Sequence, residues 1–291
     1  MGSTDPMKLR PVHRSSNFNP GPSHVSTLRL RSAAGRWVVA GSVLGSGAVF
    51  LESSVVNVAL PAIARDFHVG VVGLQWVING YLLTLSALML LGGALGDRFG
   101  RPRLFTIGCA AFALASVGCA LAPGLVALVG LRVVQGAAGA LLVPNSLAML
   151  DAAFEGEERG AAIGQWAAWS AVSTAAGPFL GGWLVDALSW RWVFAGVIVF
   201  SLAAAWIATA QVIAHEGKQP RAPRGRAARI DYAGAALGTV SLAGVVGALM
   251  SGPVVGFTDA RVLAAGIGGF VLLAAFVAYE HGVTRGGAQP I

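Results

Sequence analysis

Long apolar runs dominate this sequence and constrain its fold more than any other feature. A helix needs about 20 apolar residues to cross the hydrocarbon core of a bilayer. About eight runs reach or approach that length, and they cover residues 37–63, 71–94, 104–121, 125–150, 161–185, 192–213, 232–251 and 262–279. Because hydrocarbon offers the backbone no hydrogen-bond partners, such runs form helices. The sequence therefore predicts an all-α polytopic membrane protein with about eight spans.

Composition and the placement of charge support the same class. Hydrophobic residues make up 55% of the 291-residue chain and charged residues only 11%, with a mean hydropathy of +0.70, which excludes a soluble domain. The net charge is +7, and sixteen of the twenty Lys and Arg residues fall on the side that holds both termini. By the positive-inside rule we expect a multi-pass protein of the plasma or inner membrane with cytoplasmic termini. The partner indicated is the lipid bilayer and not a nucleic acid.

A short polar stretch at 93–104, G-A-L-G-D-R-F-G-R-P-R-L, interrupts the apolar runs. Its cations place it in the cytoplasm, and Gly96 and Gly100 permit the positive φ and close approach of a tight turn. A solvated basic loop that only sets the topology would explain the arginines, but not an Asp between glycines. The candidate functional residues are Gly93, Asp97, Arg98, Gly100 and Arg101.

Two ionisable residues lie inside predicted spans, Glu52 in the first and Arg132 in the fourth. A helical rise of about 1.5 Å per residue places both at a similar depth in the outer half of the bilayer, so the two can meet. Ionisable residues inside spans usually face a cavity or a partner, which favours a function. The alternatives are a protonated Glu52 hydrogen-bonded to a neighbouring helix, and an Arg132 that reaches outwards or binds carbonyls. We expect the first helix to end at Pro61.

The fifth span is rich in small residues. Ser173, Gly177 and Gly181 recur at every fourth position, a spacing that lets helices pack closely. Pro178 removes a backbone hydrogen bond and is expected to kink the helix. Packing alone would account for an isolated pair of such glycines. The candidate residues are Gly164, Gly177, Pro178, Gly181 and Gly182.

Two of these segments resemble motifs of the major facilitator superfamily of membrane transporters. The stretch from Gly93 is similar to its loop motif G-x-L-x-D-R-x-G-R-[KR], except that Pro102 stands at the last position. The run L-E-S-S-V-V-N-V-A-L-P resembles the first-helix signature L-D-x-T-V-V-N-V-A-L-P of the fourteen-helix drug:proton antiporters. In this run Glu52 stands for Asp and Ser54 for Thr.

The fourth and fifth spans resemble two further motifs of the superfamily. Arg132, Gln135 and Gly136 match the fourth-helix motif R-x-x-Q-G-x-G, with the last Gly displaced to Gly139. The fifth span is similar to G-x8-G-x3-G-P-x-x-G-G, with Ser173 in place of one Gly. That motif belongs to antiporter branches and implies export. The pair of spans inserted after the sixth also resembles the fourteen-helix branch.

The resemblance implies a transporter that exchanges protons for small, amphipathic, drug-like molecules by alternating access. It implies that Glu52 binds the coupling proton and that Arg132 tunes Glu52. It also implies that Asp97, Arg98 and Arg101 latch the cytoplasmic side against the opposite half. The proton is the coupling ion, and no cofactor is expected. The alternatives are a truncated, non-transporting membrane subunit or fragment, and a nutrient uptake carrier of the same fold.

Composition, charge and the resemblance together divide the chain into segments. They are a disordered cytoplasmic tail at 1–36, a six-helix N-terminal bundle at 37–213, a basic cytoplasmic linker at 214–231, an inserted transmembrane helix pair at 232–280 and a truncated C-terminal tail at 281–291. Transporters of this family are repeats with the substrate site between two halves. We expect a truncated product, because Asp97 has no evident latch partner in this chain. The alternative is a homodimer or a pairing with a complementary half-transporter.

Enzyme and metal-site signatures are absent from the sequence. It contains no G-x-S-x-G, no P-loop and no metal-ligand spacing, and its five histidines lie in predicted tails or loops. Cys109 and Cys119 are ten residues apart on one predicted helix, a separation of about 15 Å that no disulfide can bridge. We therefore predict no catalytic residues and no metal site.

Overall fold

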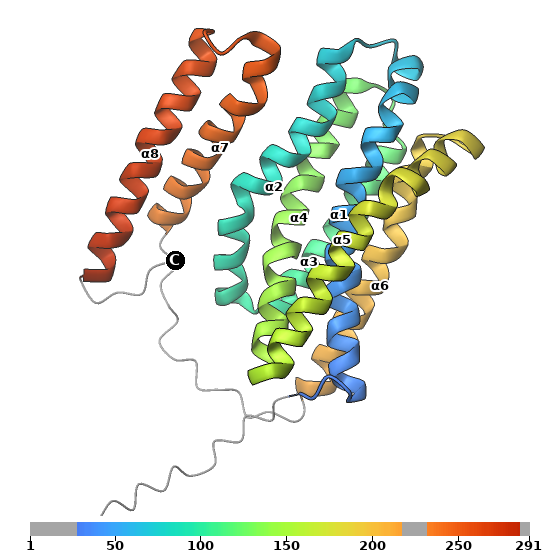
Figure 1. Cartoon of the computed structure of the whole chain (residues 1–291), viewed down its shortest axis with the longest axis vertical. Coiled ribbons are helices and arrows are strands. Elements are labelled where there is room, and N and C mark those ends of the chain that lie inside the picture. The colour runs from blue at the N-terminus through green and yellow to red at the C-terminus, as the bar shows by residue number, and fades with distance from the viewer. Residues whose placement is uncertain (1–27, 217–231, 286–291) are drawn as a thin grey trace, which may run out of the picture.

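The structure, a computed structural model, describes residues 28–216 and 232–285. These residues form eight helices and no strand, which confirms the all-helical class. The helices are α1 (Ala33–Phe67), α2 (Val71–Phe99), α3 (Arg101–Ala120), α4 (Leu125–Ala153), α5 (Gly156–Ala187), α6 (Arg191–Glu216), α7 (Tyr232–Val255) and α8 (Ala260–Arg285). Helices α1 to α6 form one bundle, and α7 and α8 form a hairpin beside it (Figure 1).

Packing within the bundle joins helices that are distant in the sequence. Helix α4 packs along α2 and α3, whereas α1 packs along α5 and α6 and also contacts α4. The α7–α8 hairpin joins the bundle through contacts of α7 with α2, and α8 packs on the far side of α7 (Figure 1). The two helices that carry the buried charges, α1 and α4, therefore meet inside the bundle.

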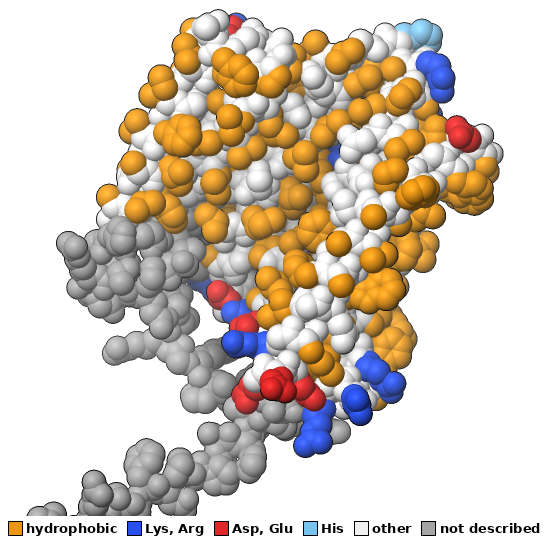
Figure 2. Space-filling model, in the orientation of Figure 1, with side chains coloured by type: hydrophobic (Ala, Val, Ile, Leu, Met, Phe, Trp, Pro, Cys, Tyr) orange, Lys and Arg blue, Asp and Glu red, His pale blue; other side chains and the backbone are white. Residues whose placement is uncertain are grey.

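Seven of the described helices are long and apolar enough, by length and composition, to cross a membrane. Helix α5 is the exception despite its 32 residues, because polar and small residues such as Gln165 and Ser170 dilute its apolar stretch. Figure 2 shows hydrophobic side chains over the sides of the molecule, with many of the visible charged side chains gathered at one end. This distribution is that of a multi-pass membrane protein.

Helix α1 is longer at both ends than its apolar run. It begins after Ser32, whose side chain accepts a hydrogen bond from the Gly35 N–H at 3.0 Å. It continues past Pro61 to Phe67, so the prediction that it ends at Pro61 is wrong. Ile63, beyond the proline, is fully buried, and its burial offsets much of the cost of the proline inside the helix.

The predicted loop at 93–104 is almost entirely helical. Helices α2 and α3 are separated by Gly100 alone, which has a φ of 99°. This conformation suits glycine, because a Cβ is strained there. Gly96 instead lies inside α2, where a Cβ would collide with the side chain of Asn145. Gly96 therefore permits the packing of α2 on α4, and Gly100 forms the turn.

The predicted tails and linker lie largely outside the described residues. The undescribed parts are 1–27, 217–231 and 286–291. Among the described residues of these segments, 28–32 precede α1 as a turn, whereas 33–36, 214–216 and 281–285 extend the neighbouring helices. Helices continue beyond their apolar runs because polar residues at a membrane surface form helix as readily as loop.

Candidate functional site

The two ionisable residues of the predicted spans meet in the interior of the bundle. Arg132 on α4 donates a hydrogen bond from Nη1 to Oε1 of Glu52 on α1, at 3.3 Å. Only 1% of the Arg132 side chain and 0% of the Glu52 side chain are exposed. A buried ion pair loses the hydration of both charges, a cost that good geometry and further hydrogen bonds must offset.

Two residues of α2 and one of α4 hold Arg132 besides Glu52. Its Nε donates to the backbone carbonyl of Val77 at 3.1 Å, and its Nη1 also donates to Gln135 Oε1 at 2.6 Å. The guanidinium lies over the ring of Tyr81, 4.0 Å from the centroid, which is a cation–π contact. Because these groups belong to α2 and to α4 itself, they hold Arg132 in place independently of α1.

Two residues of this site, Tyr81 and Ser116, were not among those predicted. The Tyr81 hydroxyl donates to the carbonyl of Val49 on α1 at 3.0 Å. Gln135 Nε2 donates to Ser116 Oγ on α3 at 2.7 Å. A tyrosine or a serine inside an apolar run is too common to mark a site, so their sequence signal is weak. Only the packing of α2 and α3 against α4 reveals them.

Glu52 has one oxygen, Oε2, that is buried and has no hydrogen-bond partner among the described residues. A carboxylate oxygen left without a donor in an apolar interior is unfavourable. A protonated carboxyl group can accept from Arg132 on one oxygen and carry the proton on the other. The geometry therefore suits a group that binds and releases a proton, with Arg132 stabilising the ionised form.

Gly136 lies where α4 comes closest to α2. A Cβ at this position would collide with the Thr84 hydroxyl and with the carbonyl of Tyr81. Gly92 of α2 makes a similar approach to the backbone of Ala140 on α4. The two helices thus touch almost backbone to backbone, and this contact brings α2 within reach of the guanidinium of α4.

The predicted latch residues lie at the end of the bundle where α2 meets α3. Asp97 Oδ1 accepts a hydrogen bond from Arg101 Nε at 2.8 Å. Arg101 Nη1 also donates to the carbonyl of Ala148 on α4 at 2.9 Å. The Arg98 guanidinium lies 5.4 Å from the centroid of the Phe99 ring. Asp97 therefore forms an ion pair within its own motif, and the absence of a latch partner for it in this chain stays a prediction.

Gly177 and Gly181 of the fifth-helix motif face α1. A Cβ at Gly177 would come within 2.7 Å of the Ser54 Cβ, and one at Gly181 within 2.7 Å of the Val55 Cγ2. Both glycines are buried, whereas Pro178 between them is exposed in an unbroken α5. These two glycines therefore let α5 lie directly on the turn of α1 that follows Glu52.

The remaining predicted glycines do not make such contacts. No atom lies within 4 Å of the place that a Cβ would take at Gly164 or at Gly182. A Cβ at Gly93 would meet only the Pro144 Cβ, at 3.9 Å, which is ordinary contact. These positions are open in the described part of the chain, and they are not part of the ion-pair site.

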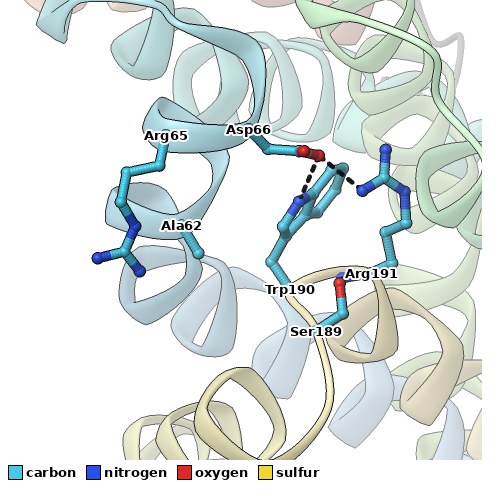
Figure 3. Close-up of a pocket in the computed structure, with 6 residues that line it drawn as sticks. All are labelled: Ala62, Arg65, Asp66, Ser189, Trp190 and Arg191. Atoms are coloured by element: carbon cyan, nitrogen blue, oxygen red, sulfur yellow. Dashed lines mark hydrogen bonds and ion pairs between the residues drawn. The ribbon is translucent and has the colours of Figure 1, made fainter.

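Asp66 and Arg191 form an ion pair at the end of the bundle opposite the α2–α3 turn. Asp66 Oδ2, in the last turn of α1, accepts hydrogen bonds from Trp190 Nε1 at 3.0 Å and from Arg191 Nη1 at 2.7 Å (Figure 3). Arg191 Nη2 also donates to the carbonyl of Ala122, between α3 and α4, at 3.4 Å. An open pocket of about 340 Å³ beside them is lined by Ala62, Arg65, Asp66, Ser189, Trp190 and Arg191. This cluster fastens α1 to two inter-helix connections.

The described residues offer no group of three or more His, Cys, Asp or Glu side chains that could hold a metal ion. Cys109 and Cys119 are both free and buried. Cys119 lies next to the ion-pair site, with its Sγ 3.7 Å from Gln135 Oε1.

A bundle of membrane-length helices around a buried ion pair defines a polytopic membrane protein, and comparison with known proteins gives its family. The family model described as Major Facilitator Superfamily matches residues 42–279. This chain belongs to that superfamily. A crystal structure of the peptide transporter POT in complex with sulfate has the same fold, with a TM-score of 0.60 at 13% identity over 87% of this chain and 54% of that chain.

Similar curated proteins are named as resistance and export proteins. Multidrug resistance protein Stp of Mycobacterium tuberculosis is 36% identical over 76% of this chain and 40% of its own length. The tetracenomycin C resistance and export protein of Streptomyces glaucescens is 36% identical over 84% of this chain and 44% of its own length. The probable actinorhodin transporter of Streptomyces coelicolor is 35% identical over 89% and 44%. The chain thus spans less than half the length of these relatives.

Proposed function

We propose that this chain is the N-terminal half of a proton-coupled antiporter that exports small, amphipathic, drug-like molecules by alternating access. The observation that carries the proposal is the buried pair of Glu52 and Arg132, 3.3 Å apart, in which Glu52 Oε2 lacks a partner among the described residues. Charged groups inside membrane spans are costly and mark proton or substrate sites. The resistance and export functions named for the relatives support export of drug-like molecules.

In this mechanism Glu52 takes up a proton while the site faces outwards and releases it while the site faces the cytoplasm. Protonation removes the charge attraction between Glu52 and Arg132. Arg132 keeps its bonds to Val77 and Gln135, so α4 remains fastened to α2 while its link to α1 weakens. Protonation thus weakens the link between α4 and α1 but not the link between α4 and α2. This difference shifts the equilibrium between two arrangements of the bundle.

The position of α7 and α8 outside the six-helix bundle supports assignment to the fourteen-helix drug:proton antiporter branch. In this assignment both termini are cytoplasmic. Asp97, Arg98 and Arg101 then lie on the cytoplasmic side, where they latch the bundle against a second half. Gly177 and Gly181 keep α5 close to α1 on the outer side of Glu52.

Purified chain reconstituted into lipid vesicles with an acidic lumen, where two copies would pair as a homodimer and supply both halves, tests this function. The wild type is expected to accumulate ethidium, a lipophilic cation, as protons leave the vesicle, and a proton ionophore is expected to abolish the accumulation. Glu52→Gln keeps the size of the side chain but binds no exchangeable coupling proton. We expect it to accumulate no more ethidium than protein-free vesicles.

Glu52→Asp is the matched control, because it keeps a carboxyl group at the same position and is expected to retain accumulation. Accumulation by Glu52→Gln equal to that of the wild type would contradict the role of Glu52. Ethidium accumulation that is the same with and without the pH gradient would contradict proton coupling.

A further inference from the structure

The two directions along α1 from Glu52 differ in the polarity of their buried side chains. Towards the C-terminal end of α1 the buried residues are Val55, Val56, Ala59 and Ile63. All four are apolar, and they share an apolar cluster with Trp190. Towards the N-terminal end, the fully buried residues include Ser42 and Ser46. The buried side chains of α1 beyond Glu52 are therefore all apolar, whereas those before it include two hydroxyl groups.

Ser46 belongs to a buried hydrogen-bonded group that joins three helices. Its Oγ lies 2.6 Å from Ser146 Oγ on α4, and it accepts a hydrogen bond from Trp166 Nε1 on α5 at 3.0 Å. Ser146 Oγ donates to the carbonyl of Val143 at 2.7 Å, so Ser46 is the donor to Ser146. Both serine side chains are fully buried. Helices α1, α4 and α5, which lie side by side in Figure 1, thus share a polar contact in the core.

Polar groups continue along the same side of α1 up to Glu52. Four positions follow at intervals of four, three and three residues: Ser42, Ser46, Val49 and Glu52. This spacing places them on one face of the helix over about 15 Å of its length. At the Val49 turn the polar groups are the backbone carbonyl and the Tyr81 hydroxyl that it binds at 3.0 Å. A row of polar groups therefore leads from the ion pair into the half of the bundle that contains the α2–α3 turn.

Both ends of this row have unused hydrogen-bonding capacity. Glu52 Oε2 and Ser42 Oγ are buried and have no partner among the described residues. Buried polar atoms without a protein partner are the places where internal water binds, provided that further polar groups lie near. Ser46 lies one helical turn from Ser42, and Arg132, with Gln135 bound to it, lies beside Glu52.

We propose that the proton released by Glu52 leaves through Ser46, Ser146 and Ser42, with water between them, towards the end of the bundle where α4 joins α5. This inference rests on the proposed function, in which Glu52 carries the coupling proton. The O–H bond of the carboxyl group breaks and a neighbouring water takes the proton. Each hydroxyl then accepts one proton on its oxygen and gives up its own. Glu52 is left as a carboxylate beside Arg132, and the proton ends on water outside the bundle.

Hydrogen–deuterium exchange of the Glu52 carboxyl group, followed by infrared spectroscopy of the purified chain in detergent, tests this route. Loss of the carboxyl band in Glu52→Gln assigns that band to Glu52. Ser46→Ala and Ser146→Ala are each expected to slow its exchange about tenfold, because each removes a hydrogen bond from the route. Ser46→Thr keeps a hydroxyl group and is expected to exchange at the wild-type rate.

Two further variants guard against effects on folding. Ser42→Ala removes a hydroxyl that no described group binds, so it leaves every described hydrogen bond in place and is still expected to slow exchange. Ser241→Ala is the matched control, because Ser241 is a fully buried serine on α7, outside the six-helix bundle, and its loss is expected to leave the rate unchanged.

Equal exchange rates in the wild type and in all three alanine variants of the route would overturn the route while leaving Glu52 as the proton carrier. A different outcome is a wild-type spectrum that shows, at every pH at which the protein is folded, no carboxyl band that Glu52→Gln removes. Glu52 would then never carry a proton, and both the proposed function and the route would be overturned. The two failures are therefore distinguishable.

Discussion

Arg132→Met is expected to destabilise the protein strongly and to abolish proton-coupled accumulation of ethidium. The substitution leaves Glu52 buried without its partner and leaves the Val77 carbonyl and Gln135 without their donor. Removing one partner of a buried ion pair costs about 3–5 kcal/mol in the free energy of unfolding. Thermal unfolding in detergent, followed by circular dichroism, measures the loss.

A double variant separates the structural and functional parts of this effect. Glu52→Leu combined with Arg132→Met replaces the pair by apolar side chains, and such replacements are often neutral or stabilising. We expect the double variant to recover most of the lost stability and none of the transport. Arg132→Lys keeps the positive charge but lacks the forked guanidinium that reaches several acceptors. Its stability is therefore expected to lie between that of Arg132→Met and that of the wild type. An Arg132→Met variant as stable as the wild type would contradict this account of the site.

Gly136→Val is the second substitution with a large expected effect. Its side chain would meet the Thr84 hydroxyl and the carbonyl of Tyr81, and the backbone of α2 cannot yield without moving the groups that hold Arg132. Overpacking a close contact typically costs about 1–3 kcal/mol, and we expect the upper part of that range. The unfolding temperature in detergent measures the change.

Gly130→Val is the matched control, because it lies on the same helix with no atom within 4 Å of its Cβ position. Both variants carry the same cost of a β-branched residue in a helix, so the difference between them isolates the contact with α2. Equal unfolding temperatures for the two variants would show that the close approach of α2 and α4 does not stabilise the protein.

The number and type of helices could be predicted from the sequence, because a backbone that crosses a bilayer must form its hydrogen bonds within the segment, as a helix does. The ends of the helices were harder to predict from the sequence. Pro61 indicated a helix end and the stretch 93–104 a loop, yet α1 continues past Pro61, and packing of Gly96 against Asn145 extends α2 to Phe99, so that Gly100 alone forms the turn. Propensity is local, whereas these ends are decided by contacts with other helices.

The ion pair was predictable because a charge in an apolar run stands out and helical rise fixes its depth. The rest of the site was not, because serines and aromatic residues occur throughout membrane helices. The bonds of Ser46 to Ser146 and Trp166 join residues at least 100 positions apart, and their partners are known only from the fold. The glycines show the same limit: Gly177 makes a tight contact and Gly182 does not, although both match one motif.

In the proposed mechanism, substrate binding and proton binding at Glu52 are linked. The most direct measurement is the pH of a weakly buffered solution of purified protein as ethidium is added. We expect the wild type to release protons when it binds ethidium, because the bound proton and bound ethidium favour opposite arrangements of the bundle. We expect Glu52→Gln to bind ethidium without releasing protons. Equal proton release by Glu52→Gln and the wild type would show that another group carries the coupling proton.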